Sequence, residues 1–164
     1  MPDALLAPRD VIPHREPFLL LTAVSELEEG VRAVGHWQLT GEEPFFDGHF
    51  PGRPTLPGVL MCESIAQLGA YALLSDEAFA GRLALFGGID RVRFRRQVLP
   101  GDRLDLEVDL GRVSRMAGRG SGRASVGVPR TNPSNLWATS PRRARTSGSS
   151  SSSSSAKRWR SIRV

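Results

Sequence analysis

The sequence predicts an α+β fold in which an antiparallel sheet wraps around one long buried helix. Residues 57–74 form an apolar stretch of helix length, and strand-like segments lie on both sides of it. The chain lacks the β–α–β alternation of a doubly wound parallel sheet. At 164 residues it has the length of one domain, which we expect to cover residues 1–126.

Two strands are expected before the helix. Residues 18–24 are apolar and bounded by Pro17, which is typical of a short buried strand. Glu28-Glu29-Gly30 has the composition of a hairpin turn. Residues 31–40 then alternate, so that Ala33, Gly35, Trp37 and Leu39 share one face, and Val34, His36 and Gln38 share the other.

The helix is predicted to begin at Pro57, because proline is well tolerated where a helix starts. Apolar residues follow on nearly every side, as in a helix that is buried all round. Ser75-Asp76-Glu77 is expected to end it. About 18 residues of helix would span roughly 27 Å.

More strands are expected after the helix. Leu83–Phe86 is apolar and Arg91–Arg95 alternates strictly. The clearest period-2 pattern is at residues 103–110, where Leu104, Leu106, Val108 and Leu110 alternate with charged residues. Residues 112–126 are expected to continue the sheet, although glycine and alanine weaken the pattern.

The charge of the chain is unevenly distributed. Residues 1–117 hold 12 Arg and 17 Asp or Glu, whereas residues 118–164 hold 10 Arg or Lys and no acid. The overall charge of +5 is therefore a property of the tail, and we predict no nucleic-acid partner for the domain.

Residues 127–164 form a low-complexity tail rich in Arg and Ser, with seven consecutive serines at 149–155. Such a composition is typical of a disordered segment. Weak electrostatic attraction of the tail to an acidic partner or to nucleic acid is a second interpretation. A third is a shifted reading frame in GC-rich DNA, which resequencing around codons 120–130 would test.

A single cysteine, Cys62, excludes an internal disulfide framework and fits a reducing compartment. No apolar run approaches the roughly 20 residues of a membrane span, and no signal sequence is evident. We therefore expect a cytoplasmic protein with no membrane association.

Residues 45–75 hold the best candidates for chemistry. His49 lies in a loop rich in Gly and Pro, and a histidine can exchange a proton near neutral pH. Glu63 lies inside the apolar helix, where burial favours the protonated form that a general acid needs. Gln67, four residues later, shares its helix face. The backbone N–H groups of Gly58 and Val59 at the helix start would stabilise a carbonyl oxygen or oxyanion.

A purely structural interpretation of these residues remains open. In it, His49 caps a turn and Glu63 is satisfied by backbone groups. Cys62 is expected to be a small apolar filler rather than a nucleophile, and His14 to brace a turn. His14, His36 and His49 lack the spacing of metal ligands, so we predict no metal and no cofactor.

Three segments resemble those of a known family. GHFPGRPTLPGVLMCESIAQ (residues 48–67), IPHREPFLLL (12–21) and IDRVRFRRQVLPGDRL (89–104) are similar to the 3-hydroxyacyl-[acyl-carrier-protein] dehydratases of the FabZ type, in the same order. The resemblance covers roughly residues 9–126, and the fourteen-position gap from His49 to Glu63 matches. It implies a hot-dog fold and a homodimer, in some members assembled as a trimer of dimers.

The resemblance also implies the chemistry. His49 of one subunit would remove the α proton of the thioester, and Glu63 of the other would protonate the departing β-hydroxyl. The N–H of Gly58 would polarise the thioester carbonyl, leaving a trans-2-enoyl product on the acyl carrier protein. Glu63 stands where the isomerising FabA-type branch carries Asp, which favours simple dehydration.

Four arginines, Arg91, Arg93, Arg95 and Arg96, form either a solvated strand face or a docking site for the acidic carrier protein. The family's last strand is missing after Val126, and Thr22 replaces a usual acid. Two alternatives to a dehydratase therefore stay open: an acyl thioesterase on the same fold, or an inactive paralogue without the last strand.

Overall fold

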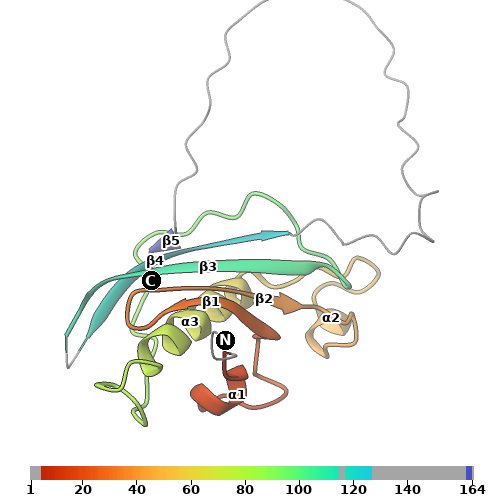
Figure 1. Cartoon of the computed structure of the whole chain (residues 1–164). Coiled ribbons are helices and arrows are strands. Elements are labelled where there is room, and N and C mark those ends of the chain that lie inside the picture. The colour runs from red at the N-terminus through yellow and green to blue at the C-terminus, as the bar shows by residue number, and fades with distance from the viewer. Residues whose placement is uncertain (1–4, 115–116, 127–161, 164) are drawn as a thin grey trace, which may run out of the picture.

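The computed structural model describes residues 5–114, 117–126 and 162–163. A five-stranded antiparallel sheet, in the order β1-β2-β3-β4-β5, curves over the long helix α3, which confirms the predicted hot-dog architecture (Figure 1). The elements in chain order are α1 (Pro8–Val11), β1 (Ala23–Glu28), β2 (Arg32–Gln38), α2 (Phe45–Gly48), α3 (Gly58–Leu74), β3 (Arg103–Val113), β4 (Gly118–Val126) and β5 (Ile162–Arg163).

Helix α3 is the centre of the hydrophobic core. Ile65, Tyr71 and Ala70 point to different sides of the helix and are 0%, 1% and 8% exposed, so most of the predicted all-round apolar surface is buried. The helix begins one residue later than expected, because Pro57 is its N-cap. It ends as predicted at Ser75, whose hydroxyl donates a hydrogen bond to the Tyr71 carbonyl (2.9 Å). The side chains of α3 are therefore carried by an element that is held in place by the core.

The sheet confirms the alternation predicted for β2 and β3. Ala33 and Trp37 of β2, and Leu104, Leu106 and Val108 of β3, are buried against the helix, while the alternate residues of each strand are more exposed. β3 pairs with β2 on one side and β4 on the other, so both of its backbone edges are hydrogen-bonded, and its apolar face packs in the core with α3. The expected hairpin turn joins β1 to β2, with Gly30 at φ 69°.

A glycine in β4 lets the sheet approach the helix closely. A Cβ atom at Gly122 would collide with the side chain of Ile65 on α3. A larger residue at this position would therefore push β4 away from the helix.

The strand predicted at residues 18–24 is wrong over most of its length. β1 begins only at Ala23, although Leu19, Leu20 and Leu21 are buried as expected. The reason is that a helix side chain, Gln67, takes the backbone groups of this segment that a neighbouring strand would otherwise pair.

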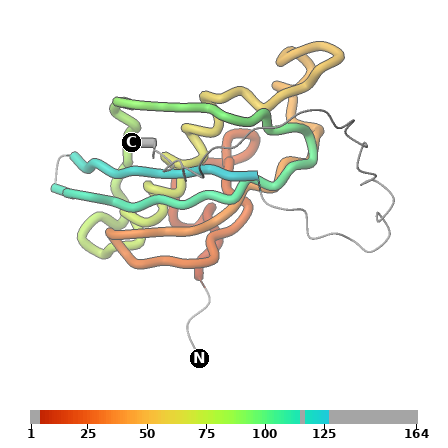
Figure 2. The backbone as a smooth tube through the Cα atoms, turned by 90° about the horizontal axis from the view of Figure 1, so that it is seen from above, coloured from red at the N-terminus to blue at the C-terminus, as the bar shows by residue number. Residues whose placement is uncertain are grey.

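The strands predicted at Leu83–Phe86 and Arg91–Arg95 are also wrong. Residues 82–97 contain no strand, and only Arg91 forms an isolated bridge. The segment runs alongside β4 on its outer side (Figure 2). A groove of about 690 Å³ lies between the two, lined by Arg93–Arg96 and by residues 121–126.

β4 ends at Val126, the last residue of its described segment, so the predicted domain boundary at residue 126 stays a prediction. Nearly all of the predicted tail lies outside the described residues. The exception is β5, which the sequence did not predict and which pairs with Ser121 and Gly122.

Candidate active site

Glu63 lies in the second turn of α3, at the edge of the apolar core. Its side chain is 20% exposed and lines a cavity of about 820 Å³. The cavity follows the helix past Ala66, Ala70 and Leu73. A carboxyl group therefore stands beside an elongated, mainly apolar space.

Gln67 holds one oxygen of this carboxyl group, as its spacing predicted. The Gln67 Nε2 donates to Glu63 Oε1 (3.0 Å) and to the Phe18 carbonyl (2.9 Å), while its Oε1 accepts from the Leu20 N–H (2.8 Å). Gln67 is 1% exposed, and these three bonds fix its amide in one orientation. The loop at residues 18–20 thereby helps to place Glu63.

His14 also faces Glu63, which the sequence did not predict. Its Nε2 lies 3.6 Å from Glu63 Oε1. The contact joins the turn after α1 to helix α3, so no local sequence pattern predicts it. The one available signal was that His14 belongs to the IPHREP segment, which resembles a family segment.

His49 is the C-cap residue of the short helix α2. Its Nδ1 lies 2.7 Å from the Thr55 carbonyl, and its ring stacks on Phe50 with the ring centroids 4.2 Å apart. A carbonyl oxygen can only accept a hydrogen bond, so Nδ1 carries the proton and Nε2 keeps its lone pair. His49 is therefore oriented as a proton acceptor.

Within one chain the structure does not bring His49 and Glu63 together. The described residues show no contact between their side chains, and His49 does not line the cavity beside Glu63. A site using both groups must draw them from different subunits or from a different arrangement of the loop.

The start of α3 offers free backbone N–H groups. Pro57 supplies no side-chain cap, and the first turn carries no acidic residue. The ring of Phe94 covers Gly58 so closely that a Cβ atom there would lie 2.8 Å from the ring. The Val59 side chain is 73% exposed. N–H groups at a helix start have no intrahelical acceptor, and a carbonyl-binding role for those of Gly58 and Val59 stays a prediction.

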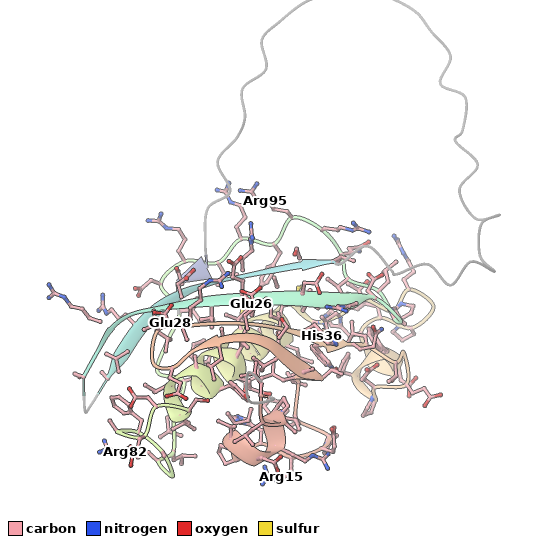
Figure 3. All side chains as sticks on the ribbon, viewed as in Figure 1. Arg15, Glu26, Glu28, His36, Arg82 and Arg95 are labelled. Atoms are coloured by element: carbon pink, nitrogen blue, oxygen red, sulfur yellow. The ribbon has the colours of Figure 1, made fainter. Side chains whose placement is uncertain are left out.

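The four arginines do not share a strand face, because their segment is not a strand. Arg91, Arg93, Arg95 and Arg96 are all exposed, and the last three line the groove beside β4. Figure 3 shows Arg95 projecting from the side of the sheet opposite to α3. The cluster is therefore positive and accessible in the single chain.

Cys62 is buried next to Glu63, and burial raises the pKa of its thiol. A thiol that resists ionisation is a poor nucleophile, in agreement with its expected filler role. Within the described part of the chain, no group of three or more His, Cys, Asp or Glu side chains is arranged to hold a metal ion. Nor does any helix there have the length and hydropathy to cross a membrane.

Comparisons with known proteins agree on one family. The model of the FabA-like domain matches residues 12–128. The 3-hydroxyacyl-[acyl-carrier-protein] dehydratase FabZ of Moorella thermoacetica is 58% identical over 117 residues, which cover 71% of this chain and 82% of the relative. The protein of the same name from Thermomicrobium roseum is 54% identical over 118 residues, covering 72% and 79%.

A solved structure supports the fold. The dehydratase heterocomplex ApeI:P from Xenorhabdus doucetiae aligns with a TM-score of 0.60 at 22% identity, covering 75% of this chain and 83% of that one. At this identity the match concerns the architecture of sheet and helix alone.

Proposed function

The chain belongs to the FabA-like family, in its FabZ-type branch, and on that premise we propose that it is a hydro-lyase of fatty acid elongation. It dehydrates a (3R)-3-hydroxyacyl thioester carried by the acyl carrier protein to the trans-2-enoyl thioester. The proposal depends on one observation: relatives named 3-hydroxyacyl-[acyl-carrier-protein] dehydratase FabZ are 51–58% identical to this chain over most of their length. The elongated apolar cavity beside Glu63 suits an acyl chain.

In the proposed mechanism, His49 Nε2 accepts the proton from the carbon α to the thioester. The Thr55 carbonyl supports this role, because it holds the ring in the tautomer with a free Nε2. The Gly58 and Val59 N–H groups stabilise the negative charge that develops on the thioester oxygen. Glu63 donates a proton to the β-hydroxyl, which leaves as water. The proposal needs no metal or organic cofactor.

The experiment that tests the role of Glu63 compares the wild type with Glu63→Gln on a 3-hydroxyacyl carrier-protein thioester. The amide keeps the size of the side chain but cannot donate an acidic proton. We expect kcat to fall by about 10²–10⁴-fold, the usual contribution of general acid catalysis. Formation of the enoyl thioester is followed by its absorbance, and equal rates would refute the role. Release of free thiol instead would identify a thioesterase.

We further propose that the site is shared between the subunits of a homodimer, His49 coming from one subunit and Glu63 from the other. Two observations support this: the lack of contact between the two residues within one chain, and the exposed apolar side chains of Leu83, Leu85 and Phe94. A trimer of dimers is the larger assembly that this dimer would permit.

A mixing experiment tests the shared site. His49→Ala and Glu63→Gln are each expected to be inactive. Equal amounts, unfolded and refolded together, should regain about a quarter of wild-type activity, because half of the dimers are mixed and each mixed dimer holds one intact site of two. No recovery, with mixed dimers present, would place both residues in one subunit.

The acyl carrier protein is the partner, and we propose that Arg91, Arg93, Arg95 and Arg96 dock it. Their exposure and positive charge support the proposal. Replacing Arg93 and Arg95 by Glu should raise KM for carrier-linked substrate and spare short thioester mimics, whereas an equal loss on both would refute docking. We place the reaction in the cytoplasm, where an unpaired cysteine stays reduced.

A further inference from the structure

We infer that His14 is a positioning residue for Glu63. It faces the same carboxylate oxygen, Oε1, that Gln67 holds, and so leaves the other oxygen, Oε2, as the atom that carries the transferable proton. The inference rests on the proposed function and adds to it the question of which atom of Glu63 reacts.

The two contacts of the Glu63 carboxyl group both involve the same oxygen, Oε1. Gln67 Nε2 donates to Oε1 at 3.0 Å, and His14 Nε2 lies 3.6 Å from the same atom. The second distance is slightly longer than a hydrogen bond, and such contacts in active sites often tighten when substrate binds. A protonated carboxyl group facing two N–H groups through one oxygen places its own hydrogen on the other oxygen. Oε2 is therefore the proton-carrying atom.

The surroundings of His14 indicate which of its two ring nitrogens carries the hydrogen. Its Nδ1 is buried and has no hydrogen-bond partner among the described residues. A cationic ring would carry an N–H at Nδ1 with no acceptor, which is costly in a buried place. A neutral ring with its hydrogen on Nε2 instead directs that hydrogen towards Glu63. His14 is thus a neutral donor, and the Nε2–H tautomer is the one that serves Glu63.

The turn that carries His14 is well anchored. Ile12 is 1% exposed, and the Arg15 guanidinium donates to the carbonyls of Ile12 (2.9 Å) and His14 (2.7 Å). The His14 ring also stacks near Phe18, whose carbonyl accepts a hydrogen bond from Gln67. The two groups that face Oε1 are therefore coupled through one short segment, and the position of Glu63 depends on both.

Two histidines with opposite tautomers are the direct spectroscopic consequence. His49 holds its hydrogen on Nδ1, facing the Thr55 carbonyl, whereas His14 holds its hydrogen on Nε2. The chain has three histidines, so ring nitrogen spectra of the ¹⁵N-labelled wild type are readily assigned, with His14→Leu identifying the His14 signals. A neutral Nε2–H tautomer at pH 7 supports the inference. An Nδ1–H tautomer or a cationic His14 would overturn it, and this readout does not depend on activity.

Kinetics supply the second test. His14→Leu removes the N–H, while His14→Gln places an amide N–H near the position of Nε2. We expect His14→Leu to lower kcat by about 10–100-fold with little change in KM, the scale of a misplaced catalytic group, and His14→Gln to restore most of the loss. The melting temperatures of both variants are measured alongside.

Each outcome has a distinct meaning. Wild-type kcat in His14→Leu, or equal losses in the Leu and Gln variants at equal melting temperature, would overturn the positioning role. Full activity of Glu63→Gln would instead overturn the proposed function on which the inference rests. Should His14→Leu fail to fold, the tautomer measurement still decides, with His14→Gln identifying the His14 signals.

Discussion

Strand β3 and the segment at residues 82–97 have comparable sequence patterns but different structures. Leu104, Leu106 and Val108 alternate with charged residues, and so do the residues of Arg91–Arg95. β3 lies between two neighbouring strands and buries its apolar face, whereas the other segment pairs only through a bridge at Arg91. The comparison shows that alternation defines a strand where the fold supplies partners for its backbone groups.

The exposed segment keeps the features of an interface. Leu85 is 81% exposed and Leu83 66%, while Leu106 is 1% exposed. Apolar side chains gathered on one exposed segment are typical of a surface that meets a partner. We therefore propose that the segment at residues 82–97 contacts a partner chain, whereas β3 contacts neighbouring strands of its own chain.

The largest effect expected from this comparison is the loss of a core side chain. Leu106→Ala should lower the free energy of unfolding by about 2–5 kcal/mol, because it leaves a cavity against α3. Leu85→Ala, the matched control, should change it by about 0.5 kcal/mol or less under dilute conditions that favour the monomer. Denaturant unfolding measures both. A loss of similar size at Leu85 would show that the segment is packed within the single chain.

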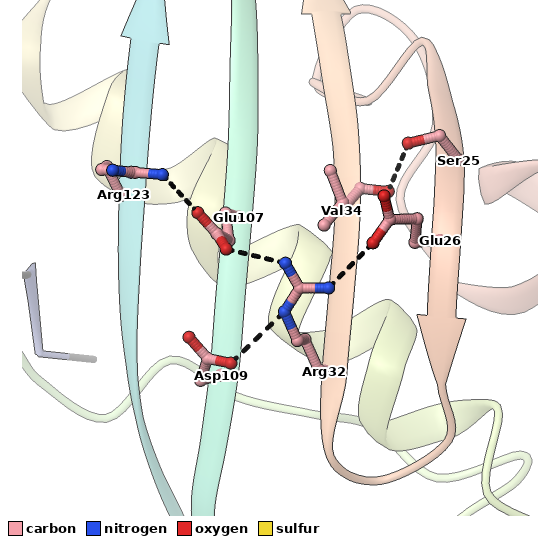
Figure 4. Close-up of polar contacts among 7 residues, drawn as sticks. All are labelled: Ser25, Glu26, Arg32, Val34, Glu107, Asp109 and Arg123. Carbon is pink, nitrogen blue, oxygen red and sulfur yellow. Dashed lines mark hydrogen bonds and ion pairs between the residues drawn. The ribbon is translucent and has the colours of Figure 1, made fainter.

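A smaller effect is expected on the solvent face of the paired region. Glu107 of β3 accepts hydrogen bonds from Arg32 of β2 and Arg123 of β4, both at 2.7 Å, and so links three strands (Figure 4). These bonds lower the pKa of Glu107 and stabilise its ionised form. Glu107→Gln should lower the free energy of unfolding by about 0.5–1 kcal/mol, an amount that shrinks at high salt.

The sign of the pH dependence follows from that lowered pKa. The stabilisation is fully present above the ordinary value of 4.5 and is lost as pH falls through the lower pKa of the folded state. Glu28→Gln on β1 is the control, since Glu28 makes no ion pair among the described residues. Equal effects of the two substitutions at neutral pH would contradict the role of the network.

The smallest effect concerns His36 of β2. Burial, and then the nearby Arg103, lower its pKa from 6.5. The unfolded chain therefore takes up a proton first, and the stability contributed by His36 is lost as pH falls below about 6.5. The difference in unfolding midpoint between the wild type and His36→Gln should change between pH 8 and pH 5 and stay constant above about pH 7.5. A constant difference throughout would refute the lowered pKa.

The sequence predicted those features that depend on local pattern. The bounds of α3 followed from its all-round apolar composition and from Pro57 and Ser75, and the i, i+4 spacing placed Gln67 beside Glu63. Residues 18–22 were mispredicted as strand because Gln67, distant in sequence, bonds the Phe18 carbonyl and the Leu20 N–H. The approach of His14 to Glu63 is also a contact between segments distant in sequence, so no sequence periodicity predicts it.

The burial of most of α3 has a consequence for how the protein loses activity. Amide hydrogens in such a helix exchange with solvent only when the whole domain opens, so those near Ile65 should be the slowest to exchange. Glu63 is carried by this same slow-exchanging element. Heating should therefore leave the carboxyl group in place until the domain unfolds, and loss of activity and loss of helix signal should coincide.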